Sequence, residues 1–132
     1  MRVVIDTNRI MASLIRDGAS RSIIFDERFE FFAPEYAIQE IYKHEDEIIE
    51  KANIYHEEFD FLFLFLFEKI KIVSKENYIP IVPHMKKLIV EKDAPFLALA
   101  VSMNADAIWS DDKHFQRQDR IRVFTTREMV EI

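Results

Sequence analysis

The chain has no cysteine and a single glycine, Gly18, among its 132 residues. Without cysteine there are no disulfides, thiolate metal sites, iron–sulfur clusters or cysteine nucleophiles. One glycine also excludes P-loops and dinucleotide-binding fingerprints, which need several glycines at set spacing. Basic residues are outnumbered, 18 against 24 acidic ones, and the net charge is −6. An acidic chain binds nucleic acid poorly on its own, so chemistry on a phosphate would need a cation between protein and substrate.

Long hydrophobic runs are also missing. The longest, residues 61–67, is far shorter than the roughly 20 residues that span a bilayer. The lack of cysteine is compatible with a reducing compartment, and the sequence opens on Met1 with no secretory leader pattern. We therefore expect a cytoplasmic protein without a membrane partner. The composition, 49% apolar and 32% charged, and the length predict one domain over residues 1–132 with a real core.

Predicted strands and helices alternate along the chain. The β-branched run Val3-Val4-Ile5, which ends at Asp6, is typical of a buried parallel strand. Thr7 or Asn8 is expected to cap the helix that follows, and Ser20 the next one. Further strands are expected at about residues 29–33, 70–73, 107–109 and 121–124, and helices at about 9–16, 20–25, 35–51, 56–69, 83–90 and 94–103. This order predicts an α/β fold, a central parallel sheet of four to five short strands with helices on both faces.

The segment 59–67 holds five of the twelve phenylalanines. Its composition alone also fits a strand, but charged residues on both sides favour a helix. A helix that is apolar all round should be buried on more than one face. Whether its phenylalanines fill the core or form an interface with a partner is open at this stage.

Four carboxylates lie where the pattern predicts buried or nearly buried positions. Asp6 ends the first strand and Asp112 follows the strand at 107–109, so the two share one rim if these strands are neighbours. Asp93 precedes an apolar helix, whose N-terminus favours an anion. Glu40 lies at the edge of the apolar stripe of its own helix. Singly, each residue is more typical of a turn, a cap or the surface. If all four converge, a divalent cation relieves their repulsion, and oxygen ligands favour Mg²⁺ or Mn²⁺.

Four sequence blocks follow one another along nearly the whole chain. They are Val-Val-Ile-Asp6-Thr-Asn8, Pro34-Glu-Tyr-Ala-Ile-Gln-Glu40-Ile, Lys92-Asp93-Ala-Pro-Phe-Leu-Ala-Leu-Ala and Ile-Trp-Ser110-Asp111-Asp112-Lys-His-Phe115. In order and spacing they resemble the PIN domain family, and within it the small prokaryotic proteins that include VapC-type toxins.

The resemblance implies a Mg²⁺- or Mn²⁺-dependent endoribonuclease that hydrolyses RNA phosphodiester bonds. It also implies a homodimer and a small antitoxin protein as partners, although some relatives are solitary or process RNA. The four acidic positions of the family, catalytic and metal-binding, fall on Asp6, Glu40, Asp93 and Asp112. Its polar accessory positions fall on Asn8 and Ser110, and the adjacent Asp111 leaves the choice between residues 111 and 112 open.

Several nearby residues have simpler interpretations. Arg9 either contacts a substrate phosphate or only begins a helix. His44, one helical turn after Glu40, is interpreted as a surface or supporting residue, and Trp109 as part of the core. His114 follows Asp112 closely and is placed either near a substrate or, as the favoured interpretation, in an ordinary loop.

Two other functions compete with the nuclease. A non-catalytic PIN-like interaction module would bind no metal, and clustered carboxylates argue against it. A phospho-acceptor receiver domain would need a second acid beside Asp6 and a lysine at the end of a late strand, and neither is evident.

Overall fold

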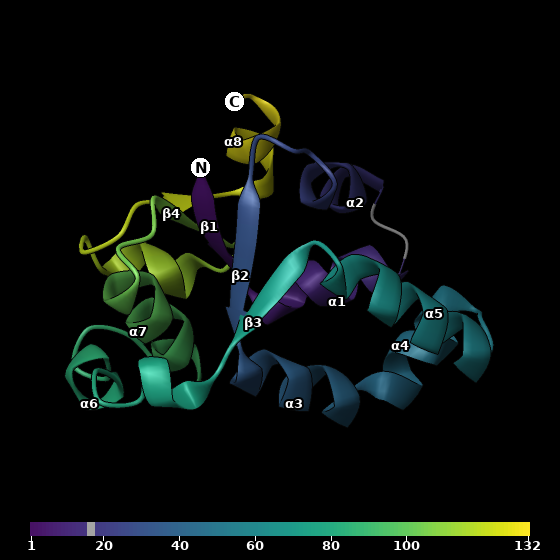
Figure 1. The fold of residues 1–132 in the computed structure, drawn as a ribbon, viewed down its shortest axis with the longest axis horizontal. Helices are drawn as coiled ribbons and strands as arrows, with labels where there is room; N and C mark the ends of the chain where they lie inside the picture. The colour runs from purple at the N-terminus through teal and green to yellow at the C-terminus, as the bar shows by residue number, and fades with distance from the viewer. Residues whose placement is uncertain (16–17) are drawn as a thin grey trace.

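The structure is a computed structural model that describes residues 1–15 and 18–132. Five parallel strands form one sheet in the order β3-β2-β1-β4-β5. The strands are β1 (Arg2–Ile5), β2 (Glu30–Pro34), β3 (Ile70–Val73), β4 (Ala107–Trp109) and β5 (Val123–Phe124). Helices lie on both sides of this sheet (Figure 1). The predicted α/β fold with a central parallel sheet is confirmed.

The first strand lies in the middle of the sheet because it is apolar on both faces. Val3, Val4 and Ile5 are fully buried, as expected for a parallel strand that is covered on both sides. Val4 pairs with Phe32 of β2 on one side and with Ile108 of β4 on the other. The strand order therefore reverses at β1, and ligands of open α/β sheets bind beyond the carboxyl ends of the strands at such a point.

Eight α-helices surround the sheet in the part of the chain that the structure describes. They are α1 (Thr7–Ile15), α2 (Gly18–Ile24), α3 (Glu35–Lys43), α4 (Glu45–Ala52), α5 (His56–Phe67), α6 (Val82–Met85), α7 (Ala94–Ser102) and α8 (Thr126–Val130). Three short 3₁₀ turns cover Lys75–Asn77, Glu91–Asp93 and Lys113–Arg117. The apolar helix α7 packs on β1, β2 and β4, with α6 against it, while α1 and α2 lie on the other side (Figure 1).

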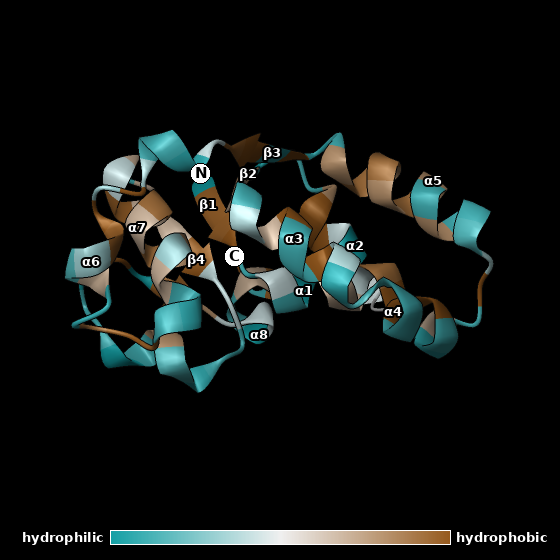
Figure 2. Ribbon diagram, turned by 90° about the horizontal axis from the view of Figure 1, so that it is seen from below, coloured by the Kyte–Doolittle hydropathy of each residue, from teal (hydrophilic) through white to brown (hydrophobic). Residues whose placement is uncertain are grey.

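The hydrophobic residues are concentrated along the strands and α7 (Figure 2). Within this core Trp109 is fully buried, and its ring lies 5.6 Å from that of Phe31. The interpretation of Trp109 as a core residue is confirmed.

The prediction of a single helix over residues 35–51 is wrong, because the helix is interrupted at His44. This residue ends α3 and precedes α4, with φ −105° and ψ 14°. The break turns α4 onto α1 and buries Ile48. The sequence does carry a signal for it, since three acidic residues, 45–47, form the first turn of α4, where the helix dipole favours negative charge.

The early helix boundaries also differ from the prediction. Helix α1 begins at Thr7, because the Asp6 carbonyl already accepts a hydrogen bond from the Arg9 N–H at 3.0 Å. Asn8 therefore lies inside the helix with Thr7. The expected end at residues 16–17 lies outside the described residues. Helix α2 begins at Gly18, so Ser20 is an internal residue rather than its cap.

Three later elements are shifted or shorter than expected. Pro34 is the last residue of β2 instead of breaking it. The helix expected at 83–90 is only α6, because the Leu88 N–H turns back to the Met85 carbonyl at 2.9 Å. The strand expected at 121–124 is only β5, since the Ile121 N–H bonds to the side chain of Gln118.

The phenylalanine-rich segment is helical as predicted, but it is not buried on more than one face. One stripe, Phe59, Phe63 and Leu66, packs into the core. On the opposite side Phe61 and Leu64 are each 68% exposed. The segment therefore supplies both core and surface. Among the described residues, no helix is both long and apolar enough to cross a membrane.

Candidate active site

The carboxyl ends of β1 and β4 bring Asp6 and Asp112 to one rim of the sheet. The Asp6 N–H donates to the Trp109 carbonyl at 3.1 Å, so the two chain segments leave the sheet side by side. The buried Ser110 then connects the acids. Its hydroxyl donates to Asp6 Oδ2 at 2.7 Å, and its Oγ accepts from the Asp112 N–H at 3.0 Å. Ser110 thus orients the Asp6 carboxylate and fixes the start of the loop that carries Asp112.

Asp93 reaches this rim from the turn before α7 and is 95% buried, with 5% of its surface exposed. His114 lies beside it, with Nδ1 3.8 Å from Asp93 Oδ2 and 3.2 Å from Asp112 Oδ1. One ligand atom from each of Asp93, Asp112 and His114 lies within 4.8 Å of the others. The chain therefore brings together three potential metal ligands, two of which were expected and one of which was not.

Burial and the charge of neighbouring acids raise the pKa of two of the rim carboxyl groups, Asp93 and Asp6. Burial, together with the charges of Asp112 and Asp6, raises the pKa of Asp93 to about 6, although Lys92 and His114 oppose the shift. Burial also raises the pKa of Asp6 against the hydrogen bonds from Ser110 and the Asn8 N–H, and the charge of Asp112 adds to the increase. The side chain of Asp93 makes no capping hydrogen bond to α7, so the helix N-terminus does not outweigh burial.

Glu40 faces the same region from α3. Its Oε1 accepts a hydrogen bond from the Thr7 hydroxyl at 2.6 Å, which ties α3 to the start of α1. Burial raises the pKa of Glu40, the Thr7 bond lowers it, and the charges of Asp6 and Lys92 act in opposite directions. Glu40 and Asp6 both lie outside the group of ligand atoms within 4.8 Å. We call Asp6, Glu40, Asp93 and Asp112 the acidic cluster.

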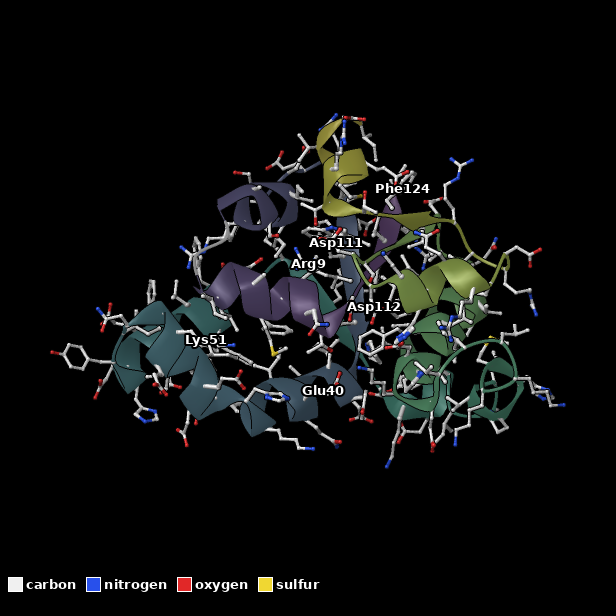
Figure 3. The ribbon with its side chains drawn as sticks, turned by 180° about the vertical axis from the view of Figure 1, so that it is seen from behind. Arg9, Glu40, Lys51, Asp111, Asp112 and Phe124 are labelled. Atoms are coloured by element: carbon white, nitrogen blue, oxygen red, sulfur yellow. The ribbon has the colours of Figure 1, made fainter. Side chains whose placement is uncertain are left out.

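The neighbouring Asp111 points away from the other acids, so that of the two adjacent aspartates only Asp112 faces them. Its Oδ1 accepts from the Thr126 N–H at 2.7 Å. Its Oδ2 accepts from the Thr126 hydroxyl at 2.7 Å and pairs with Arg9 Nη1 at 3.0 Å. The Thr126 oxygen also accepts from the Trp109 indole N–H at 3.0 Å. We call Arg9, Asp111, Trp109 and Thr126 the Asp111 network. Figure 3 shows Asp111 beside Arg9, with Asp112 between Asp111 and Glu40 in that view.

The remaining sequence candidates occupy the periphery. Asn8 is exposed, and only its backbone N–H approaches Asp6, at 3.4 Å from Oδ1. Asn8 lines a surface hollow of about 300 Å³, and His44 and Lys51 are among the other residues that line it. His44 lies on the surface, as interpreted, with Nδ1 3.1 Å from Glu47.

His114 is the residue that the sequence interpretation missed. A weak signal was present, because His114 follows Asp112 by two residues at a loop that leaves the sheet. The Asp112 carboxylate accepts from the His114 N–H at 2.9 Å and closes a tight turn. That turn places the imidazole beside the acids.

The residues at the rim fit a divalent cation. Asp93 Oδ2 and His114 Nδ1 are both buried, and neither makes a hydrogen bond to any residue that the structure describes. A buried carboxylate oxygen without a partner is costly. Nearby carboxylates that repel one another add to this cost. A cation bound between Asp93 and Asp112 would remove both penalties.

A family model for the PIN domain matches residues 4–130. The chain belongs to the PIN domain family. None of the curated proteins matches its sequence. The resemblance seen in the four sequence blocks is therefore confirmed at the level of the family.

Two solved structures have the same fold as this PIN domain. A chain of VapBC2 from Rickettsia felis, solved bound to a DNA fragment from the promoter, superposes with a TM-score of 0.70 at 11% identity, covering 95% of this chain and 98% of that one. A chain of FitAcB from Neisseria gonorrhoeae gives a TM-score of 0.67 at 16% identity, with the same coverage of 95% and 98%. Identities this low establish the fold of the chain, and its chemistry has to be argued from its own residues.

Proposed function

We propose that this PIN domain is a metal-dependent endoribonuclease that hydrolyses RNA phosphodiester bonds. The observation that carries the proposal is the buried Asp93 Oδ2 without a hydrogen-bond partner, next to Asp112 at the rim of the sheet. Members of the PIN family are generally metal-dependent nucleases, which supports the same assignment. A scaffold has no physical need for carboxylates whose pKa is raised by burial and by neighbouring acids.

Asp6, Asp93, Asp112 and Glu40 would hold Mg²⁺ or Mn²⁺, directly or through water. When bound, such an ion supplies Lewis acidity toward a phosphodiester oxygen and lowers the pKa of a water. A phosphate of the substrate would supply further oxygen ligands to the ion.

The supporting residues hold the carboxylates in place. The Ser110 hydroxyl fixes one oxygen of Asp6, and the Thr7 hydroxyl fixes one oxygen of Glu40. Each carboxylate keeps a second oxygen for a ligand. Lys92, whose charge lowers the pKa of both Glu40 and Asp93, supplies a cation for a phosphate of the substrate. Asn8 and Ser110 are the accessory polar residues, and Asp111 acts only by holding the loop.

The direct test is cleavage of RNA by the Asp6→Asn variant. The amide keeps the size of the side chain and the bond from Ser110 but removes the negative charge. We expect cleavage in Mg²⁺ or Mn²⁺ to be lost while the circular dichroism spectrum is unchanged. Asp119→Asn is the matched control, since Asp119 is an exposed residue outside the cluster, and it should cleave at the wild-type rate. Unchanged cleavage by Asp6→Asn in a clean preparation would reject the assignment.

We further propose that residues 1–132 are a single cytoplasmic domain that serves as the toxin of a toxin–antitoxin pair and forms a homodimer. One similar chain comes from VapBC2 of Rickettsia felis, solved with a DNA fragment from the promoter, and this likeness supports a protein partner. The exposed apolar face of α5, Phe61, Leu64 and Phe65, supports an interface. Sedimentation of the purified chain, with and without the product of an adjacent gene, tests both associations.

A further inference from the structure

His114 is held by its backbone in one position relative to the acids. Its N–H donates to Asp112 Oδ1 at 2.9 Å, within the turn Lys113–Arg117. The same carboxylate oxygen lies 3.2 Å from Nδ1 of the ring. The turn therefore presents Nδ1 to the acidic cluster, while the side chain as a whole is 39% exposed.

Burial distinguishes the two sides of the imidazole. Nδ1 is buried, lies 3.8 Å from Asp93 Oδ2, and makes no hydrogen bond within the described residues. A histidine that served only as a counter-ion would donate a hydrogen bond to one of these carboxylates. A neutral imidazole instead offers the lone pair of one ring nitrogen to a metal. The buried nitrogen and the buried Asp93 oxygen face the same space, and neither makes a hydrogen bond within the described residues.

We infer that His114 is a nitrogen ligand of the metal site, together with Asp93 and Asp112, and that it makes the site selective for first-row transition ions such as Mn²⁺ and Co²⁺ over Mg²⁺. This inference rests on the proposed function, because it assumes that the acidic cluster binds a cation. Imidazole suits transition ions, whereas Mg²⁺ prefers an all-oxygen set that keeps several waters. A cluster of carboxylates alone would not distinguish these ions by ligand type.

The test is a spectroscopic measurement on the full chain loaded with Mn²⁺. Pulsed electron paramagnetic resonance should show a ¹⁴N coupling to Mn²⁺ in the wild type. The coupling should disappear in His114→Ala and in His114→Gln, which keeps the length of the side chain. His44→Ala is the matched control, because His44 lies one helical turn from Glu40 but contacts Glu47, and it should keep the coupling. Thermal melts check that each variant is folded.

Calorimetry gives the second readout. For His114→Ala we expect the Kd for Mn²⁺ to rise about tenfold or more and the Kd for Co²⁺ to rise further. The Kd for Mg²⁺ should change much less. Equal strengthening of Mn²⁺ and Mg²⁺ binding would show that His114 is only a counter-ion and would overturn the inference. So would a ¹⁴N coupling that persists in both His114 variants.

These outcomes are distinct from failure of the proposed function. If Mn²⁺ binds and RNA is cleaved, but His114→Ala changes neither ion's affinity, only the inference fails. If the wild type binds none of the three ions, both fail.

Discussion

The adjacent residues Asp111 and Asp112 belong to two polar groups at the same rim of the sheet, and these groups are built in opposite ways. In the Asp111 network every oxygen of the carboxylate has a donor, from the Thr126 backbone, the Thr126 hydroxyl or Arg9. In the acidic cluster Asp93 keeps a buried oxygen without a donor, and neighbouring acids raise its pKa. The first group joins α1 and α8 to the loop after β4. The acidic cluster is electrostatically unfavourable when no cation is bound.

The comparison shows why adjacent residues of one type differ in role. Alternate residues leaving a strand point to opposite sides, so Asp111 and Asp112 diverge as the chain leaves β4. What lies on each side then decides the function. Donors surround Asp111, while Asp112 meets other acids and His114.

The largest expected difference is in catalysis by the two aspartate variants. Asp112→Asn should lower kcat/KM for RNA at least about a hundredfold, since loss of a ligand costs at least as much as loss of a group that orients one. Asp111→Asn should lower it by less than about tenfold, because Asp111 does not face the cluster. Initial rates on one RNA substrate in Mn²⁺ measure both. Equal losses in folded variants would erase the distinction between the two groups.

The Asp111 network should matter most for stability. Thr126→Val removes the hydroxyl that serves Asp111, Arg9 and the buried indole N–H of Trp109. We expect the free energy of unfolding to fall by about 2 kcal/mol, as for a buried donor left without a partner. Urea denaturation measures the change. Thr126→Ser keeps the hydroxyl and should retain most of the stability, whereas equal destabilisation by serine would point to the lost methyl group instead.

Removing a charge from the acidic cluster should instead stabilise the metal-free protein. The pKa of Asp93 is raised from 3.8 to about 6 in the folded chain. The stabilising contribution of the Asp93 carboxyl to the free energy of unfolding is therefore fully present only below about pH 4. It is lost as the pH rises through about 6. In metal-free buffer at pH 8, Asp93→Asn should raise the free energy of unfolding by about 1 to 2 kcal/mol, after allowance for solvent screening.

The pH dependence supplies the control for this prediction. At about pH 3, below the ordinary pKa of an Asp side chain, the Asp93 carboxyl is mostly neutral in both folded and unfolded chains, so the variant and the wild type should have nearly equal stability. Saturating Mn²⁺ at pH 8 should make the wild type more stable than Asp93→Asn, because the wild type binds the ion more tightly. A variant that is less stable than the wild type in metal-free buffer at pH 8 would contradict the account.

The sheet and the places of Asp6 and Asp93 in the fold were predictable because their signals are local. Val3-Val4-Ile5 is a β-branched run with an acid directly after it, and the rule for parallel strands places that acid at the carboxyl edge. The block at Asp93 lies just before an apolar helix with Pro95 in its first turn. Such patterns need no knowledge of distant residues.

Other features could not be predicted because distant contacts decide them. Asp111 is turned away from the cluster by Thr126, fifteen residues later in the chain. The acidic residues 45–47 indicate a helix start after His44, but the packing of α4 on α1 decides that the helix is interrupted there. The exposed position of Phe61 depends on which stripe of α5 faces the core, and a helix that is apolar all round gives no indication of this. The position of His114 beside Asp93 also depends on folding, which brings the two residues together.

The most direct test of the account is the position of a bound ion. Crystals of the full chain soaked in Mn²⁺ should give an anomalous difference peak between the carboxylates of Asp93 and Asp112, within coordinating distance of both. No such peak should lie at Asp111. A chain that binds Mn²⁺ only elsewhere on its surface, or not at all, would contradict the claim that folding brings the acidic cluster together to hold a cation.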